Sequence, residues 1–501
     1  MNTDPTKPLF ILEMANNHMG SVEHGIRIVR ECASVTRDFP FRFAVKLQYR
    51  DIDTFIHPAF QSRMDLKFVK RFSETRLSWE QYKALKDAIA EHGFLTMCTP
   101  WDELSVGKIE EHGFDIIKVP SCYFNDWPLL ERIVQSKLPV IASAGGATLE
   151  DVDRVVSFLK HRNKAFSLMH CVGEYPTRND QLQLNQIDLF RQRYAGVEIG
   201  FSTHEAPDNC DPIKLAIGKG ATLFEKHVGV PTDTVKLNAY SANPAQLRLW
   251  LEAARQAYEL CGVSGRRHAF STAELGTLRD LQRGAFAKEK IAKGERIQTS
   301  RVFLAIPNTP TQIVANDLSK YTDFFATEDI EPNAPVLREN TRRVEKQKLV
   351  FQAIQQVKNM LRQGQVIVPS QVELEVSHHY GLENFERFGS TIITVVNREY
   401  CKRLIVLLPG QTHPEQWHKL KDETYHILHG EINLALDGVQ QRRGANDIVI
   451  IPRGVKHGFT TSTGVIIEEI STFYTQGDSY YTDATIEKNG ARKTLVTHWM
   501  D

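Results

Sequence analysis

Eight short apolar runs, each followed by a helical pattern, recur between residue 8 and about residue 262. The runs are "LFILEMA", "RFAVKLQ", "GFLTMCTP", "DIIKVPS", "PVIASAG", "AFSLMHC", "VEIGFSTH" and "TLFEKHV", and the helical patterns include 79–92, 127–136, 148–160 and 244–260. Continuous apolar strands separated by helices indicate a parallel sheet that helices cover on both faces. Eight such units in about 250 residues predict an α/β fold, the TIM (β/α)8 barrel. A doubly wound open sheet is the alternative, but no glycine-rich phosphate loop follows the first run.

The chain changes character after residue 262, where the predicted barrel domain 1–262 ends. Residues 263–342 hold two similar blocks of short strand and turn, "GAFAKEKIAKGERIQTSRVFLAIPN" and "ATEDIEPNAPVLREN", which predict a small separate α+β domain. A charged helical pattern over 343–364 predicts a linker. Residues 365–501 are rich in strand and turn patterns, which predict an all-β sandwich or small barrel.

The composition argues against two classes of partner. Lys and Arg number 61 and Asp and Glu number 61, so no net field favours nucleic acid. No apolar run approaches the roughly 20 residues that cross a bilayer, and the start "MNTDPTKPLFILEMANNH" lacks the apolar core of a signal peptide. The seven cysteines are scattered without C-x-x-C pairs, which indicates reduced thiols. We therefore expect a cytoplasmic protein that binds neither nucleic acid nor membrane.

All eight predicted strands end in polar side chains, where an apolar pattern would otherwise continue. In chain order these side chains are Glu13, Asn17, Lys46, Gln48, Thr99, Lys118, Ser121, Ser143, Tyr175, Ser202, His204, Glu225 and His227. The carboxyl ends of the strands form the active face of such barrels. One polar residue of this kind usually caps a turn, but a plain scaffold has no need of polar groups at all eight ends. The pattern therefore predicts a site.

The mixture of side chains indicates a polyanion beside a metal. Lys46 and Lys118 are inward-pointing cations, and the serines supply neutral donors for ligand oxygens. His204 and His227 end adjacent strands, so their imidazoles can meet on one divalent cation and leave open coordination positions. A histidine pair alone is weak evidence, because lone histidines are usually structural. Beside two lysines and Glu13, the pair predicts a divalent metal site.

Seven ordered motifs in this region resemble the sialic acid (N-acetylneuraminate) synthase family. The motifs are "FILEMANNHMGSVEHGIRIV", "AVKLQ", "CTPWDELSV", "IIKVPS", "SLMHCVGEYPT", "GFSTHE" and "LFEKHV". The resemblance covers roughly residues 8–342 and includes a region similar to the family's antifreeze-like (SAF) domain. It implies condensation of phosphoenolpyruvate (PEP) with an aldose to a 2-keto-3-deoxy nonulosonic acid. It also implies a divalent metal, usually Mn²⁺, and a homodimer with swapped antifreeze-like domains.

The resemblance gives each matching residue an expected role. His204 and His227 match the metal ligands, Glu13 matches the catalytic carboxylate, and Lys46 is expected to take part in catalysis. Groups that hold PEP match Lys46, Lys118, Ser121, Ser143 and Ser202, with Gln48 and Thr99 close by. Tyr175 matches a tyrosine near the sugar, and Asn17 is expected to contact substrate.

Most departures from the family pattern fall at positions that recognise the acceptor sugar in relatives. Tyr123 stands where an acidic residue usually follows the fourth-strand serine, and Gly173 replaces an asparagine. The loop "PTDTVKLNAYS" replaces P-G-P-D, and Ile306 replaces an arginine that in relatives reaches a sugar in the other subunit. Loss of a charged anchor implies an acceptor other than N-acetylmannosamine, whereas the reaction class is kept.

Two motifs in the last third of the chain resemble those of the cupin family. The motifs are "PGQTHPEQWHKLKDETYHILHGE" and "NDIVIIPRGVKHGF". The resemblance implies one divalent metal bound by Gln416, His418, Glu423 and His457. Gln416 stands where a histidine is usual, and Asn446 where a glycine is usual. Because an amide oxygen is a weaker ligand than imidazole for late transition metals, the identity of the metal stays open.

The role of this domain and of the whole chain has several candidate readings. "KLKDETYHIL" is similar to cupins that isomerise sugars, so the domain could supply the aldose; a scaffold for oligomerisation or sensing is the alternative. For the chain, the first hypothesis is a PEP-dependent synthase. The second is a sugar-binding regulatory protein on a decayed barrel with the cupin as sensor, and the third makes the cupin the enzyme. The retained charged residues of the barrel favour the first.

Overall fold

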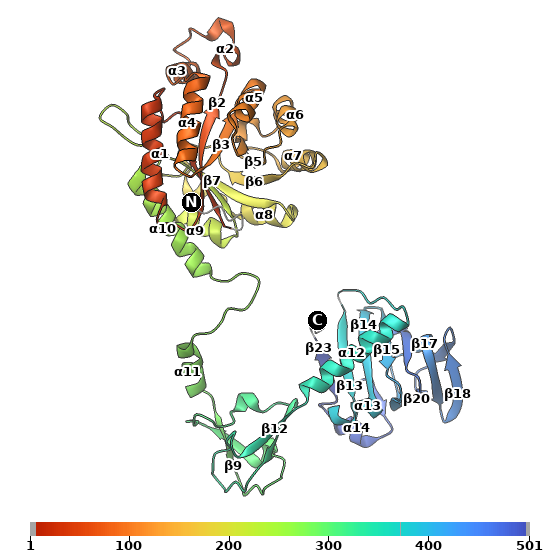
Figure 1. Ribbon diagram of the computed structural model, residues 1–501. Coiled ribbons are helices and arrows are strands. Elements are labelled where there is room, and N and C mark those ends of the chain that lie inside the picture. Colours follow the sequence, from red (N-terminus) through yellow and green to blue (C-terminus); the bar gives the residue numbers. More distant parts are fainter. Residues whose placement is uncertain (1–6, 371, 497–501) are drawn as a thin grey trace. The chain divides into compact units, whose positions relative to one another are not determined.

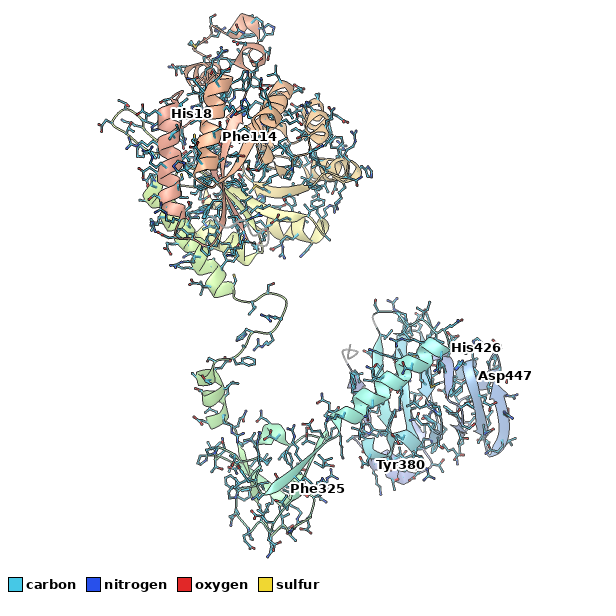
Figure 2. All side chains as sticks on the ribbon, viewed as in Figure 1. His18, Phe114, Phe325, Tyr380, His426 and Asp447 are labelled. Atoms are coloured by element: carbon cyan, nitrogen blue, oxygen red, sulfur yellow. The ribbon has the colours of Figure 1, made fainter. Side chains whose placement is uncertain are left out.

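The structure is a computed structural model that describes residues 7–370 and 372–496 (Figure 1). The chain divides into two compact units, Met1–Ala269 and Phe270–Asp501. Figure 2 shows the side chains of both units, with His18 and Phe114 labelled in the first and Tyr380 in the second. The first six residues of the segment analysed for a signal peptide lie outside the described residues. Within the described part, no helix combines the length and apolarity needed to cross a membrane.

Eight parallel strands of the first unit close into a barrel in chain order, which confirms the predicted (β/α)8 fold. The strands are β1 (Leu9–Glu13), β2 (Arg42–Tyr49), β3 (Leu95–Pro100), β4 (Ile116–Val119), β5 (Val140–Ser143), β6 (Phe166–Cys171), β7 (Glu198–Thr203) and β8 (Leu223–His227). The helices are α1 (Val22–Thr36), α2 (Ile52–Phe55), α3 (Lys67–Glu74), α4 (Trp79–Glu91), α5 (Glu103–His112), α6 (Trp127–Gln135), α7 (Leu149–His161), α8 (Asn185–Arg193), α9 (Asp211–Gly218) and α10 (Pro244–Cys261). The helices predicted over 79–92, 127–136, 148–160 and 244–260 are present as α4, α6, α7 and α10.

Capping side chains explain why these helices begin where they do. Ser78 starts α4 with a capping box, in which its hydroxyl accepts from the Gln81 amide and the Gln81 side chain accepts from the Ser78 amide. Asn243 and Gln246 do the same for α10, where Pro244 occupies the first helical position. Such caps satisfy amides that a helix leaves unpaired, and each typically contributes about 1 kcal/mol.

Side chains alternate along each barrel strand between two cores. Phe10 and Leu12 of β1 pack toward the helices. The inner core, which we call the axial plug, consists of Leu9, Ile11, Ala44, Met97, Ile116, Ile141, Met169 and Leu223. Because successive side chains point to opposite faces of a strand, Glu13 and Glu225 occupy the next inward positions on β1 and β8. The axial plug is therefore followed, toward the carboxyl ends, by a layer of polar side chains.

The second unit begins with short strands around a small core. Its elements are α11 (Thr272–Asp280), β9 (Gly284–Ala287), β10 (Val302–Ala305), β11 (Thr322–Ala326) and β12 (Thr341–Glu345). β9 pairs with β10 and β11 pairs with β12, both antiparallel. The first predicted strand-and-turn block contains β9 and β10. The second lies between β11 and β12 and joins the first through isolated bridges such as Ile291–Ile330, so the two blocks share one core.

An eleven-stranded sheet occupies the rest of the second unit and confirms the predicted all-β region. Its strands are β13 (Glu373–His378), β14 (Gly389–Asn397), β15 (Tyr400–Leu407), β16 (Thr412–Trp417), β17 (Glu423–Leu436), β18 (Val439–Gly444), β19 (Ile448–Ile451), β20 (His457–Thr460), β21 (Val465–Thr472), β22 (Tyr480–Tyr481) and β23 (Lys493–Val496). Two short helices are α13 (Phe385–Phe388) and α14 (Ala484–Lys488). The long strand β17 pairs with four others, β18, β19, β20 and β21, and so links the sheet.

The helix predicted as a linker over 343–364 is present as α12 (Gln347–Gln363). Its apolar side, which includes Val350, Ile354 and Val357, is buried in the same core as Leu374 and Val406 of the sheet. The helix therefore covers one side of the C-terminal sheet in addition to connecting it to the small strands.

Candidate functional site

The carboxyl ends of the barrel strands surround a cavity of about 660 Å³. Its lining includes most of the residues predicted for the site: Glu13, Lys46, Gln48, Lys118, Ser121, Ser143, Tyr175, Ser202, His204 and His227. These residues come from β1, β2, β4, β5, β6, β7 and β8 or from the segments that follow them. Residues far apart in the sequence thus meet because the barrel gathers its strand ends at one face.

Two buried cations and two buried carboxylates form a network in the wall of this cavity. The Lys46 ammonium contacts the carboxylate of Glu13 and lies 2.9 Å from Glu225 Oε1, while Lys118 Nζ lies 3.9 Å from Glu225 Oε2. Burial alone would lower the pKa of Lys46, but the carboxylates of Glu13 and Glu225 outweigh it and raise that pKa. Burial and the neighbouring carboxylate of Glu225 raise the pKa of Glu13, against the effect of Lys46. The four opposite charges compensate one another, as buried ions must.

Serine hydroxyls beside the lysines remain able to donate to a ligand. Lys118 Nζ donates to Ser143 Oγ at 2.6 Å, and the Gly145 amide donates to Ser121 Oγ at 3.1 Å. Because each oxygen accepts in these contacts, its own O–H is left to donate elsewhere. The Ser202 hydroxyl instead donates to Glu225 Oε1 at 3.2 Å. Lysine charge and hydroxyl donors together make this side of the cavity suited to an oxygen-rich anion.

The two histidines at the ends of β7 and β8 lie together, with ring centroids 5.3 Å apart. His204 Nδ1–H donates to the carbonyl of Val172 at 2.8 Å, which leaves the lone pair on Nε2. Burial lowers the pKa of both His204 and His227, so both rings are neutral at pH 7. Neutral imidazole is the metal-ligating form, and at His204 a carbonyl on the other nitrogen also fixes the ring, so the pair fits a divalent ion. Among the described residues, no third His, Cys, Asp or Glu completes a three-ligand group here.

Two tyrosines stand beside the histidine pair. The ring of Tyr175 lies 4.2 Å from that of His204 and 5.0 Å from that of Tyr240, and Tyr240 lies 5.0 Å from His227. Tyr175 is half exposed. Tyr240 comes from the loop after β8, which departs from the family pattern, and the sequence analysis did not include it in the site.

Two residues predicted to contact substrate lie outside the cavity lining. Asn17 Nδ2 donates to the carbonyl of Val228 at 2.8 Å and to Ser241 Oγ at 3.1 Å, so it ties the end of β1 to the segment after β8. Thr99 is buried, and its hydroxyl has no partner among the described residues. The contacts of Asn17 and Thr99 with a substrate stay predictions.

Sequence reasoning placed Glu225 among the polar strand ends but gave it no catalytic or binding role, and it did not consider Trp101; both line the cavity. The signal for Glu225 was present, because Glu225 and His227 are two positions apart on one strand and must share a face. Trp101 follows β3 and carried no comparable signal, because a tryptophan after a strand is usually a packing residue.

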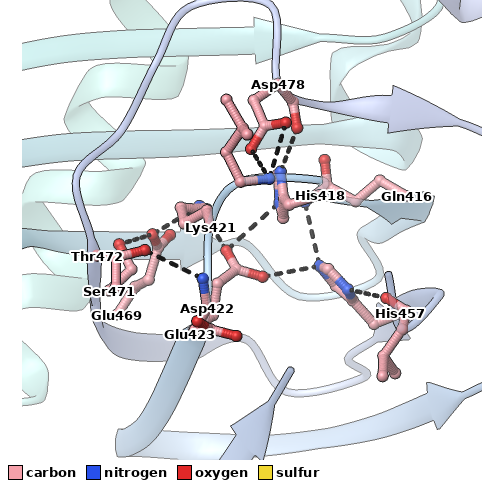
Figure 3. Close-up of polar contacts among 12 residues, drawn as sticks. Gln416, His418, Lys421, Asp422, Glu423, His457, Glu469, Ser471, Thr472 and Asp478 are labelled. Carbon is pink, nitrogen blue, oxygen red and sulfur yellow. Dashed lines mark hydrogen bonds and ion pairs between the residues drawn. The ribbon is translucent and has the colours of Figure 1, made fainter. Parts of the chain in front are cut away.

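A second cluster of polar side chains lies in the C-terminal sheet (Figure 3). It consists of the four residues predicted to hold a metal there, Gln416, His418, Glu423 and His457, all buried. His418 Nε2 lies 3.5 Å from Glu423 Oε1, and His457 Nε2 lies 3.2 Å from Glu423 Oε2. Gln416 Nε2 lies 3.3 Å from His457 Nε2.

The hydrogen bonds of these histidines decide where their lone pairs point. His418 Nδ1–H donates to the carbonyl of Asp478 at 2.6 Å, and His457 Nδ1–H donates to that of Val455 at 3.1 Å. When the rings are neutral, both Nε2 lone pairs therefore face the carboxylate of Glu423. His418 Nε2 is buried without a hydrogen-bond partner among the described residues, and Glu423 Oε1 contacts Lys421. Three converging electron-pair donors of this kind fit a divalent cation.

Lys421 is a fixed cation at the edge of this cluster. Its Nζ lies 2.5 Å from Glu423 Oε1 and 2.8 Å from Glu469 Oε1 (Figure 3). Burial would lower the pKa of Lys421, but Glu469 and Glu423 outweigh it and raise that pKa. Sequence analysis missed Lys421 because it lies between the motif positions and its partner Glu469 is on a distant strand.

Two family models match the chain. The model described as NeuB family matches residues 43–266, and the model described as cupin domain matches residues 403–473. The first match falls on the barrel that carries the cavity, and the second includes all four residues of the C-terminal cluster.

Several known proteins are similar to part of this chain. The solved structure of a Chromobacterium violaceum protein described as spore coat polysaccharide biosynthesis protein E is 52% identical, with a TM-score of 0.65; the match covers 67% of this chain and 100% of that chain. N,N'-diacetyllegionaminic acid synthase of Campylobacter jejuni is 25% identical over 336 residues, 64% of this chain and 95% of that protein. N-acetylneuraminate-9-phosphate synthase of Mus musculus is 24% identical over 301 residues, 57% of this chain and 80% of that protein. The chain therefore belongs to the NeuB family, the sialic acid synthase family that its barrel motifs resemble, and it also carries a cupin domain.

Proposed function

We propose that the chain is a PEP-dependent synthase that condenses PEP with an aldose to a 2-keto-3-deoxy sugar acid of the nonulosonic type and releases phosphate. The observation that carries this proposal is the meeting of Lys46 and Lys118 with the neutral pair His204 and His227 in one cavity. The names of the relatives, which are synthases of related sugar acids, support the same class of transferase.

The lysine side of the cavity is the proposed PEP site. Lys118 and the hydroxyls of Ser121 and Ser143 offer charge and donors for the phosphate and carboxylate oxygens. Holding PEP there places its C3 toward the histidine pair, where the aldehyde carbon of the sugar would lie, and this proximity contributes to the rate. Tyr175 stands on the proposed sugar side.

Glu13 is the proposed base for the second half of the reaction. After the carbon–carbon bond forms, water adds to C2 of the former PEP, and loss of phosphate leaves the 2-keto group. The Glu13 carboxylate accepts the proton of that water. Burial and Glu225 raise the pKa of Glu13, which makes it a stronger base than an ordinary glutamate.

His204 and His227 are the proposed ligands of a divalent metal, with Mn²⁺ as the expected ion. Such an ion, when bound, supplies Lewis-acid polarisation of the aldehyde oxygen. The contribution of the chain is to keep both imidazoles neutral through burial and to fix His204 through the carbonyl of Val172.

The remaining expectations are proposals about organisation. We divide the chain into a synthase barrel (1–262), an antifreeze-like domain (263–342), a helical connector (343–364) and a cupin domain (365–501). We propose a cytoplasmic homodimer with swapped antifreeze-like domains. The cupin domain is proposed to bind a second divalent metal through Gln416, His418, Glu423 and His457, and to bind or isomerise a sugar.

Phosphate release from PEP with Mn²⁺, measured across a panel of aldoses, tests the proposed function. Mass spectrometry checks for an adduct three carbons longer than the aldose. We expect sugar-dependent release that His227→Ala abolishes and that His161→Ala, an exposed helical histidine, does not change. Release without any sugar would indicate hydrolysis of PEP. No release from metal-loaded protein would favour the alternative, a sugar-binding regulatory protein with the cupin as sensor.

A further inference from the structure

Arg50 is the residue that follows β2, and it lies directly behind the cavity wall. It is two positions after Gln48, which lines the cavity. The arginine is only 4% exposed. Its guanidinium carbon lies 4.1 Å from the ring centroid of Phe72 and 4.6 Å from that of Trp101, which also lines the cavity. Stacking on two aromatic rings fixes the guanidinium in place.

This buried cation is not paired with a carboxylate of the described residues. Among the described residues, no Asp or Glu oxygen lies within the 4.0 Å of an ion pair with Arg50. Its Nη2 donates to Gln48 Oε1 at 2.7 Å, while its Nε is buried without any acceptor. Burial lowers the pKa of Arg50, but an arginine remains charged at neutral pH. An uncompensated buried charge is costly, so its presence beside a cavity calls for a ligand that balances it.

The hydrogen bond from Arg50 also sets the orientation of Gln48. Arginine has donors and no acceptor, so the amide atom that it contacts must be the oxygen. Gln48 lines the cavity, and its Nε2 hydrogens are left without an acceptor among the described residues. The indole N–H of Trp101 is likewise buried without an acceptor. This wall therefore presents positive charge and N–H donors, two of which, Arg50 Nε and Trp101 Nε1, have no acceptor among the described residues.

Among the described residues around the cavity, one cation is left without a carboxylate. Lys46 and Lys118 face the carboxylates of Glu13 and Glu225, whereas Arg50 stands alone. The proposed PEP site already has its own lysine and serine donors on the other strands. We infer that the wall formed by Gln48, Arg50 and Trp101 recognises an anionic group, a carboxylate or a phosphate, on the acceptor sugar. Gln48 is the contacting residue and Arg50 a positioning residue, and the inference rests on the proposed function for the identity of the acceptor as an aldose.

Binding without turnover tests the inference. The full chain, with metal removed by a chelator and PEP at saturation, is titrated calorimetrically with matched aldohexoses, their 6-phosphates and the corresponding hexuronates. We expect the anionic members to bind the wild type about tenfold tighter than the neutral sugars, as one charge-assisted contact allows. Arg50→Met should bring the ratio close to one. Gln48→Glu supplies a carboxylate that can form an ion pair with Arg50, so it should also bring the ratio close to one. It replaces Arg50→Met in the test if that variant does not fold.

Arg76→Met is the matched control, because Arg76 lies in the same region but forms an exposed pair with Asp53. It should leave the ratio unchanged. Equal binding of neutral and anionic sugars by the wild type, or an anion preference that survives both variants, would overturn the inference. Weakened PEP binding in Arg50→Met with an unchanged ratio would also overturn it and assign Arg50 to PEP. Failure of the proposed function would appear differently, as absent PEP binding by the wild type. The neutral and anionic sugars are then compared without PEP. The ratio of their affinities still tests the inference. The calorimetric ratios for wild type, Arg50→Met, Gln48→Glu and Arg76→Met thus settle the role of this wall.

Discussion

The barrel cavity and the C-terminal cluster hold their charges in opposite ways. In the barrel, Lys46 and Lys118 lie against Glu13 and Glu225, so cations are already in position for an organic anion. In the C-terminal cluster, two imidazole lone pairs converge on Glu423. The comparison teaches that both regions gather histidine and glutamate, but the barrel carboxylates face two lysines, whereas Glu423 faces one lysine and two imidazoles; we propose that an organic anion binds beside the first set and a metal ion at the second.

Replacing one buried lysine by methionine in each region tests this contrast. The largest expected effect is the loss of phosphate release in the barrel variant. Lys118→Met removes a buried ammonium from the proposed PEP site, and we expect PEP-dependent phosphate release to fall more than ~10³-fold, because the charge that positions the phosphate is lost. Steady-state kinetics with the best aldose measure it. Lys421→Met should keep release within a factor of about two. Loss of release in both variants would break the contrast.

Lys421→Met should have its own effect on stability. It leaves the buried carboxylates of Glu423 and Glu469 without their shared ammonium, a change that typically costs about 3 kcal/mol. Arg403 lies near Glu469 and softens the loss. Hydrogen exchange of β17 measures the change locally, which suits a chain of several domains.

A divalent metal should restore part of that protection. It would place positive charge beside Glu423 again, so protection of β17 in Lys421→Met should rise more on adding metal than it does in the wild type. Equal protection with and without metal would count against a cation site in the C-terminal cluster.

Acid should destabilise both units, through one buried histidine in each. Burial lowers the pKa of His18 in the barrel to about 4, with Arg50 contributing, and burial also lowers the pKa of His379 in the second unit to about 4. Each ring is neutral in the folded state, whereas the unfolded imidazole binds a proton below its pKa of about 6.5. The free energy of unfolding is therefore unaffected by these rings above about pH 6.5 and falls as the pH drops toward 4. At pH 5 the loss is about 2 kcal/mol per histidine.

Hydrogen exchange of each unit at pH 7 and pH 5 measures this loss. His18→Asn and His379→Asn keep a polar group at each position and should each flatten the pH dependence of their own unit only. A unit whose protection is the same at both pH values would contradict the expectation for its histidine.

The smallest predicted effect is a gain at Gln416. Gln416→His places an imidazole where the amide now faces His457, and we expect about tenfold tighter binding of Ni²⁺ or Zn²⁺ by the C-terminal cluster. Competition with a chromogenic chelator measures the affinity. Gln416→Leu, which removes the amide, is the control, and an unchanged affinity in Gln416→His would mean that this position does not reach the ion.

Local patterns predicted the barrel and much of the candidate site. Apolar strands alternating with helices are a repeated signal, and caps such as Ser78 and Asn243 mark helix starts within the sequence. Polar residues at strand ends, such as Lys46 and His227, could be predicted to meet because the barrel topology brings all strand ends together. The four clustered residues of the cupin domain were expected from the resemblance of their motifs to the cupin family, and their role as metal ligands stays a prediction.

What the sequence analysis missed depends on partners from distant segments. Asn17 was expected at substrate but is used by the carbonyl of Val228, more than two hundred residues away. Lys421 is held by Glu469 on another strand. Arg50 stands out only because no carboxylate lies among its described neighbours. Pairings of this kind are set by tertiary packing and leave no periodic pattern in the chain.

The axial plug has a kinetic consequence. Eight apolar side chains block the barrel below the cavity, so molecules enter and leave through one mouth. Lys118 is buried while Tyr175 at the histidine pair is half exposed. On the proposed function, the acceptor seated near Tyr175 obstructs the route to the lysines. PEP must therefore bind first, and an abortive complex with sugar alone should appear as substrate inhibition when the aldose is in excess.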